Sequence, residues 1–284
     1  MADVVIDYVQ HGPLTVIDPD QRWLLDGLLG DPVSICESAR TLVVSPEDAM
    51  AAGVPEDRLK EQDARPVRDL LAVLARLRPE RLDHPRPPEA RVVGTSRHSA
   101  TLACSMLRAQ GYAARVRCGF RTAAGQVAPR IQWITEWWST AGAGWIRMDA
   151  EPAGLGPQDG TVSPEAPADF VTAGEAWQVH RSGSPDRPAG GPPGADRAHL
   201  SPEISAGVVR DLAALCKLEM LPTDTWGRMA MPQYGFTSAA YVNLIDVVAS
   251  LSIRDEPEGL ARLFASADLA VPPDMIDMPP VAER

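Results

Sequence analysis

Residues 94–120 read GTSRHSATLACSMLRAQGYAARVRCGF, and this stretch carries the clearest structural signals in the chain. It opens on a turn with a good helix N-cap, after which apolar residues recur at helical spacing. Gly111 is a natural place for that helix to end, since glycine readily takes the backbone conformation found at helix termini. Apolar and polar residues alternate from 114 to 120, as they do in a strand with one buried face. The stretch therefore predicts a helix that leads directly into a strand.

The sequence on either side of this unit predicts more strands beside it and helices further out. Two strands are expected at 131–138 and 145–149, after a polar loop. Helical spacing of apolar residues dominates 20–83, and residues 169–181 and 203–266 are expected to be helical again. Helices, then a helix with three strands, then helices again indicate an α+β fold rather than alternating βαβ units.

Four segments can be distinguished along the chain, and we expect them to form one compact domain. Proline is frequent, at 27 of 284 residues, which is about twice the usual level. The stretch from 182 to 196 is rich in proline and glycine and lacks apolar periodicity, which predicts a mobile surface loop or a lid. The expected segments are a helical N-terminal region at 1–88, a mixed core at 89–180, a Pro/Gly-rich loop at 181–200 and a helical C-terminal region at 201–284.

The formal net charge of -11 argues against nucleic acid and anionic membranes as main partners, because phosphate binding requires a basic surface. No apolar run approaches the roughly 20 residues that span a bilayer, and the first residues lack the pattern of a signal peptide, so we expect a cytoplasmic protein. The scattered cysteines signal neither a metal site nor a disulfide frame, and no cofactor is indicated. They are Cys36, Cys104, Cys118 and Cys216.

Four blocks around the predicted helix and strands resemble the core of the transglutaminase-like superfamily, whose papain-like site holds a cysteine, a histidine and an aspartate. The blocks are GTSRH at 94–98, LRAQGYAAR at 107–115, QWITEW at 132–137 and WIRMDA at 145–150. Further blocks, similar to one bacterial subgroup of these proteins, lie at 8–13, 91–94, 170–177 and 209–227. The resemblance implies a helix packed on an antiparallel sheet, with helical N- and C-terminal flanks.

The chain departs from the superfamily's pattern at the positions that carry its chemistry. Block by block, the nucleophile cysteine corresponds to Ser96 and the base histidine to Gln132, whereas the third member is kept as Asp149. A serine hydroxyl is a poor nucleophile unless a base takes its proton, and a glutamine side chain cannot take one. Cys104 lies eight residues past Ser96 and is expected in the core. We therefore expect no thiol chemistry of the superfamily's kind.

Two titratable residues close to these positions have two interpretations each. His98 stands where the superfamily's pattern has an aspartate, and it is either a base with a neutral imidazole or a satisfied, partly buried histidine. Glu136 is either an acid or base at the site or a carboxylate paired with arginines. The available arginines are Arg97, Arg115 and Arg147.

Tryptophans concentrate around the core, where most are expected to pack and one or two to line a pocket for an apolar or aromatic ligand. The candidate substrate-binding residues are Arg97, Trp133, Trp137 and Trp226. The candidate catalytic residues are Ser96, His98, Gln132, Glu136 and Asp149. No metal ligands are predicted.

Three functions fit this pattern. The first is a repurposed enzyme of bacterial secondary metabolism, which acts on a small-molecule intermediate by acid–base and hydrogen-bond catalysis. Its reactions would be cyclisation, dehydration, isomerisation or addition, and the polar residues at both reactive positions favour it. The second is a binding protein without catalysis that holds a small molecule or a peptide. The third is an acyl transferase or hydrolase that uses Ser96.

Overall fold

The computed structural model confirms the α+β fold, with helices packed on an antiparallel sheet. It describes residues 6–28, 30–123, 126–155, 165–182, 202–230, 238–266 and 268–276. The Pro/Gly-rich loop expected at 181–200 lies, beyond its first two residues, outside the described residues. In the ranges just given, no helix is both long and apolar enough to cross a membrane.

The N-terminal part is mostly helical, as its apolar spacing predicts. Its elements are η1 (Pro19–Leu25), α1 (Pro32–Thr41), β1 (Val43–Val44), α2 (Pro46–Ala51), η2 (Glu56–Asp63), α3 (Val67–Leu77), η3 (Pro88–Ala90) and β2 (Val92–Val93). Helix α1 begins where the Asp31 side chain accepts the Ser34 backbone N–H, at 2.9 Å. Helix α3 buries its apolar face, which includes Leu70, Leu71 and Leu74. The two short strands pair in parallel and bring α1 next to the start of the core.

The core consists of helix α4 (Ser96–Ala109) and a four-stranded antiparallel sheet. The strands are β3 (Ala114–Ala123), β4 (Gln126–Ser139), β5 (Gly144–Asp149) and β6 (Phe170–Thr172), in the order β5-β4-β3-β6. All residues of α4 from Ser96 to Arg108 are buried. The helix ends at Gly111, whose φ of 85° is the left-handed conformation that glycine takes without strain.

The C-terminal part differs from its helical prediction in two places. Residues 170–172 form the edge strand β6 instead of the start of a helix, because they pair with β3 in register with Gly119 to Arg121. The chain is also non-helical between Leu215 and Gly227, where Lys217 takes a φ of 67°. The helices are α5 (Ala173–Ser182), α6 (Pro202–Leu215), η4 (Gly227–Ala230), α7 (Ala239–Ile253), α8 (Pro257–Phe264) and α9 (Pro273–Ile276).

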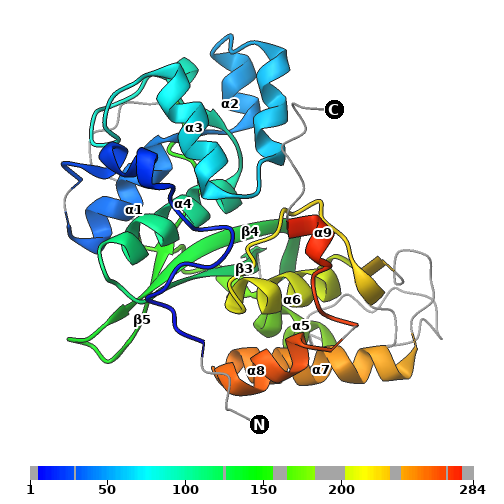
Figure 1. The fold of residues 1–284 in the computed structure, drawn as a ribbon. Coiled ribbons are helices and arrows are strands. Elements are labelled where there is room, and N and C mark those ends of the chain that lie inside the picture. The colour runs from blue at the N-terminus through cyan, green and yellow to red at the C-terminus, as the bar shows by residue number, and fades with distance from the viewer. Residues whose placement is uncertain are drawn as a thin grey trace.

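The sheet separates two hydrophobic clusters. One joins α1, α3 and α4 to the sheet and contains Leu70, Leu107 and Trp133. The other joins α5, α6, α7 and α8 and contains Trp177 and Leu212. Figure 1 shows the N-terminal helices on one side of the strands and the yellow and orange C-terminal helices on the other. Helix α4 therefore lies on the face of the sheet that the N-terminal helices cover.

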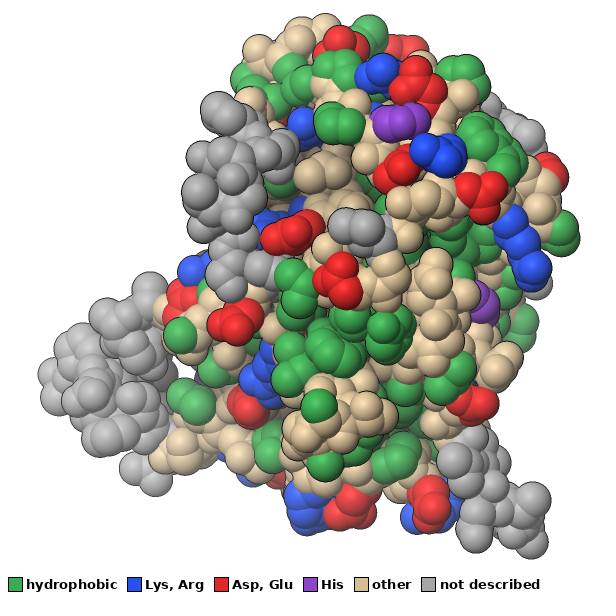
Figure 2. Space-filling view, turned by 90° about the vertical axis from the view of Figure 1, so that its left-hand side faces the viewer, with side chains coloured by type: hydrophobic (Ala, Val, Ile, Leu, Met, Phe, Trp, Pro, Cys, Tyr) green, Lys and Arg blue, Asp and Glu red, His purple; other side chains and the backbone are tan. Residues whose placement is uncertain are grey.

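One face of the molecule carries α1 and the hairpin of β4 and β5, which point to the left in Figure 1. On this face, seen in Figure 2, Lys and Arg side chains alternate with Asp and Glu, and hydrophobic side chains gather across the middle. The exposed apolar side chains of the chain include Trp23, Trp138 and Ile146. The described part of this face thus gathers no single basic patch.

Candidate active site

Ser96 is the first residue of α4, and its side chain lies against strand β4. Thr95 caps the helix, and its side chain accepts the backbone N–H of His98. The Ser96 Oγ accepts the backbone N–H of Trp133 at 3.2 Å, and Ser96 is 6% exposed. The helix start is therefore fixed next to the strand position of Gln132.

Gln132 directly precedes Trp133 on β4, and its side chain reaches the end of β5. Its Nε2 donates to Asp149 Oδ1 at 3.5 Å, which is a long hydrogen bond. On its other side Gln132 pairs with Gly119 in β3. A side chain at Gly119 would collide with the carbonyl oxygen of Val171, so only glycine allows β6 to approach here. The structure thus brings Ser96, Gln132 and Asp149 together.

Arg40 from α1 joins this group, although no sequence pattern indicated it. Its guanidinium lies 3.3 Å from Asp149 Oδ2, and its Nε donates to the backbone carbonyl of Glu151 at 2.8 Å. The backbone N–H of Glu151 donates in turn to Asp149 Oδ1 at 3.0 Å. The Asp149 carboxylate is therefore bound by an amide, a backbone N–H and a cation.

Glu151 is the second residue that the sequence did not single out. Burial raises the pKa of its carboxyl group, Arg130 opposes the rise, and Asp149 adds to it. Its side chain is 40% exposed and its Oε1 lies 3.5 Å from Arg130. A carboxyl group with a raised pKa beside Asp149 is able to give or take a proton closer to neutral pH than an ordinary glutamate.

His98 does not point at Ser96 but closes the start of its helix. Its Nδ1 accepts the backbone N–H of Thr95 at 3.0 Å, and the residue is fully buried. Its ring packs on Gly94, where an added Cβ would lie 2.9 Å from the imidazole. Burial, followed by the neighbouring Arg97, lowers the pKa of His98 to about 3. The imidazole is thus neutral, in a capping position.

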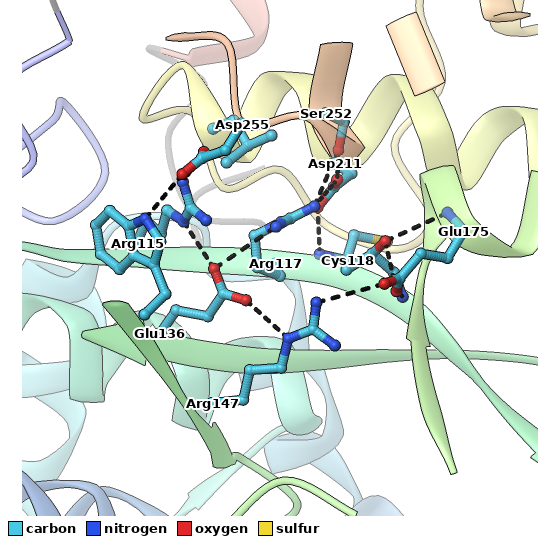
Figure 3. A network of polar contacts seen from close by, with 12 residues as sticks. Arg115, Arg117, Cys118, Glu136, Arg147, Glu175, Asp211, Ser252 and Asp255 are labelled. Atoms are coloured by element: carbon cyan, nitrogen blue, oxygen red, sulfur yellow. Dashed lines mark hydrogen bonds and ion pairs between the residues drawn. The ribbon is translucent and has the colours of Figure 1, made fainter. Parts of the chain in front are cut away.

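Glu136 lies four residues beyond Gln132 on β4, within a group of arginines (Figure 3). It accepts hydrogen bonds from Arg115 Nε at 2.7 Å and from Arg147 Nε at 3.1 Å, and Arg117 lies 3.5 Å away. Burial alone would raise the pKa of Glu136, but Arg117, Arg115 and Arg147 outweigh it and lower the pKa. Of the two interpretations, this geometry is that of a carboxylate paired with arginines. Arg97 is not among its partners.

The arginine group continues into the C-terminal helices. Arg117 pairs with Asp211 of α6 at 2.8 Å, and Asp211 also accepts the backbone N–H of Cys118 and the hydroxyl of Ser252. Arg115 pairs with Asp255 at 2.5 Å and lies 3.9 Å from the ring centroid of Trp145. The network therefore joins the sheet to α6 and to the residues that follow α7.

The candidate binding residues lie in structural positions. Arg97 is fully buried and donates to the backbone carbonyls of Ala64, Arg65 and Glu219. Trp133 is in the core below α4, and Trp137 packs against Tyr112. Trp226 donates its indole N–H to the carbonyl of Leu269 at 2.9 Å, in the C-terminal cluster. None of these contacts brings the four side chains to Ser96.

The described residues leave Ser96 with no side chain that takes its proton. The one hydrogen bond that the structure gives its hydroxyl comes from a backbone N–H. Cys104 offers no alternative, since it is fully buried and burial raises its pKa to about 12. The described residues contain no group of three or more His, Cys, Asp or Glu side chains that could hold a metal ion.

The comparisons with known proteins agree with this geometry at the level of the core. The family model of the transglutaminase-like superfamily matches residues 75–150, which run from the end of α3 through α4 to the end of β5. No curated protein and no solved structure matches the chain. The matched range contains Ser96, Gln132 and Asp149 in the positions described above. Residues 75–150, which hold α4 and strands β3 to β5, thus belong to the transglutaminase-like superfamily.

Proposed function

We propose that this protein binds the carbonyl or carboxamide group of a small molecule or peptide at Ser96, Gln132 and Asp149, without forming a covalent intermediate. The observation that carries the proposal is that Gln132 donates to Asp149 while Ser96 accepts the backbone N–H of the next residue, Trp133, and that no described side chain accepts the serine proton. The two positions that depart from the superfamily's pattern, Ser96 and Gln132, both carry polar side chains. The site lacks the base that acyl transfer requires.

The chemistry of the group suits a neutral polar ligand. Gln132 offers an amide with both a donor and an acceptor, and Ser96 offers a hydroxyl that also has both. Arg40 balances the charge of Asp149, so an anion or a cation gains little extra attraction here. A carbonyl or carboxamide matches these donors and acceptors by hydrogen bonds alone.

A fragment screen with primary amides, methyl esters and thioesters tests the proposal. We expect some amides to raise the melting temperature of the wild type and to lose this effect in Gln132→Leu. Intact mass spectrometry should show the unmodified chain, and chromatography should show unchanged fragment. An added acyl mass on Ser96, or a product that disappears in Ser96→Ala, would favour an acyl transferase or hydrolase and sink the proposal.

A second candidate is a non-thiol enzyme of bacterial secondary metabolism that uses acid–base and hydrogen-bond catalysis. The observation that favours it is Glu151, whose carboxyl group has a raised pKa and whose backbone binds Asp149. In this case Glu151 would transfer the proton, and Gln132 would polarise a carbonyl. Product formation from a carbonyl substrate that falls strongly in Glu151→Gln, yet persists in Glu136→Gln with a folded chain, would support it. Equal activity of Glu151→Gln and the wild type would rule out that role.

A further inference from the structure

A cavity of about 400 Å³ lies at the C-terminal end of α4, far from the serine at its start. Its walls come from two parts of the chain that are distant in sequence. One is the stretch with His11, Arg22 and Asp26 in and around η1, and the other is the end of α4 with Arg108. Because an α-helix rises 1.5 Å per residue, its 14 residues separate the two places by about 20 Å. The cavity is thus not part of the candidate active site.

One side of this cavity is positively charged, although the whole chain has a net charge of -11. Burial lowers the pKa of His11, and the nearby cations Arg108, Lys217 and Arg22 lower it further, whereas a hydrogen bond from the imidazole to the backbone of Thr15 raises it. The cations together make the potential at His11 positive. An anionic group next to this imidazole is therefore stabilised.

Arg22 is the cation of this group that is open to a ligand. Arg108 is buried and already donates to Thr15 Oγ1 at 2.8 Å and to the carbonyl of Ala114 at 2.9 Å. It also lies 3.6 Å from the carboxylate of Glu219. Arg22, in contrast, is exposed and makes no hydrogen bond or ion pair with any other residue in the part of the chain that the structure describes.

The rest of the lining is apolar, apart from the Asp26 carboxylate and the Gln110 amide. Apolar contact is offered by Val16, Ile17, Leu25 and Ala109. A volume of this size is in the range of small-molecule pockets. The cavity therefore combines one charged end with an apolar wall.

We propose that this cavity binds a small organic acid, whose carboxylate meets Arg22 and whose apolar body lies along Ile17 and Leu25. Arginine binds carboxylates in a bidentate manner, through two parallel N–H groups of its guanidinium. The Asp26 carboxylate, which also lines the cavity, repels the carboxylate of a bound acid, so removal of the charge of Asp26 strengthens binding. This cavity is separate from Ser96, so the proposal does not depend on whether Ser96 binds a ligand.

Titration of the full chain with hexanoate, hexanol and hexylamine, followed by calorimetry and ligand-observed NMR, tests this assignment. Hexanoate should bind, and hexanol and hexylamine should bind at least about tenfold more weakly, which is the scale of one charge-assisted hydrogen bond. Arg22→Gln should weaken hexanoate binding about tenfold at an unchanged melting temperature, and Asp26→Asn should tighten it. Arg254→Gln, at an exposed arginine that pairs with Glu256, is the matched control and should have no effect.

The proposal would be overturned by the absence of hexanoate binding, by equal or tighter binding of hexylamine, or by unchanged binding in Arg22→Gln. Ser96→Ala must also leave hexanoate binding intact. A loss there would place the acid at the start of α4 and contradict a second site.

Discussion

Strand β4 carries two polar clusters four residues apart, one at Gln132 and one at Glu136, and they are built differently. At Gln132 the side chain makes one long hydrogen bond, 3.5 Å to Asp149, and Ser96 accepts the next backbone N–H at 3.2 Å. At Glu136 the carboxylate is 1% exposed, and two arginines donate to it at 2.7 and 3.1 Å. The first cluster is loosely held, and the second is a dense ionic network.

The difference separates a place for a ligand from a place that supports the fold. A hydrogen bond at 3.5 Å contributes little to folding, so its groups can change partners at small cost. A buried carboxylate between three arginines cannot change partners at small cost, because the loss of one partner leaves a buried charge uncompensated. The strongest electrostatics of this core therefore hold the sheet to the C-terminal helices. The weaker contacts stand where the resemblance to the superfamily places its reactive groups.

The largest effect is expected from the network. Glu136→Gln removes the charge that Arg115, Arg117 and Arg147 share, and breaking such a buried pair costs about 3–5 kcal/mol of unfolding free energy. Urea denaturation measures this loss of unfolding free energy. Glu256→Gln, at a half-exposed carboxylate paired with Arg254, is the control and should cost less than about 1 kcal/mol. Similar losses in both variants would mean that the network supports the fold no more than a surface pair does.

A second effect should appear as a pH dependence at the start of α4. The folded pKa of His98, about 3, is below its ordinary value of 6.5, so the unfolded chain binds more protons between these values. Stability is therefore lost as pH falls below 6.5, by about 2 kcal/mol on reaching pH 5. His98→Asn keeps an acceptor for Thr95 but cannot be protonated there. Urea midpoints of the two proteins should converge toward acidic pH, and parallel curves would contradict a buried neutral imidazole.

The smallest effect on stability is expected at the proposed binding site. Ser96→Ala removes one acceptor for the Trp133 N–H and should cost about 1 kcal/mol or less. Thermal and urea unfolding measure the loss of stability in Ser96→Ala, with Glu136→Gln measured for comparison. A loss as large as that of the network variant would show that Ser96 is a structural residue and would remove the contrast between the two clusters.

The sequence predicted the parts of this fold that local signals determine. Helix α4 and strands β3, β4 and β5 occur where the N-cap, Gly111 and the alternation of residues place them. Strand β6 was missed, since three residues before a helix carry no periodicity of their own and take their conformation from pairing with β3. The alternation along a strand cannot reveal such a long-range pairing.

The candidate site was predictable only where it follows the superfamily's blocks. Those blocks placed Ser96, Gln132 and Asp149 in one group, and the structure brings them together. Arg40 could not be inferred, because its contact with Asp149 depends on the packing of α1 against α4. Among the arginines considered for Glu136, Arg97 instead turns toward backbone carbonyls at the start of its helix. Partner choice among equivalent arginines is decided by tertiary geometry.

The absence of a base for Ser96 is tested most directly by a fluorophosphonate, which forms a covalent bond with activated serines as fluoride leaves. Mass spectrometry should find Ser96 unlabelled in the wild type, since Gln132 cannot accept its proton. In Gln132→His, which places an imidazole between Ser96 and Asp149, labelling of Ser96 should appear and should vanish on adding Ser96→Ala. Labelling of Ser96 in the wild type as fast as in Gln132→His would contradict the account.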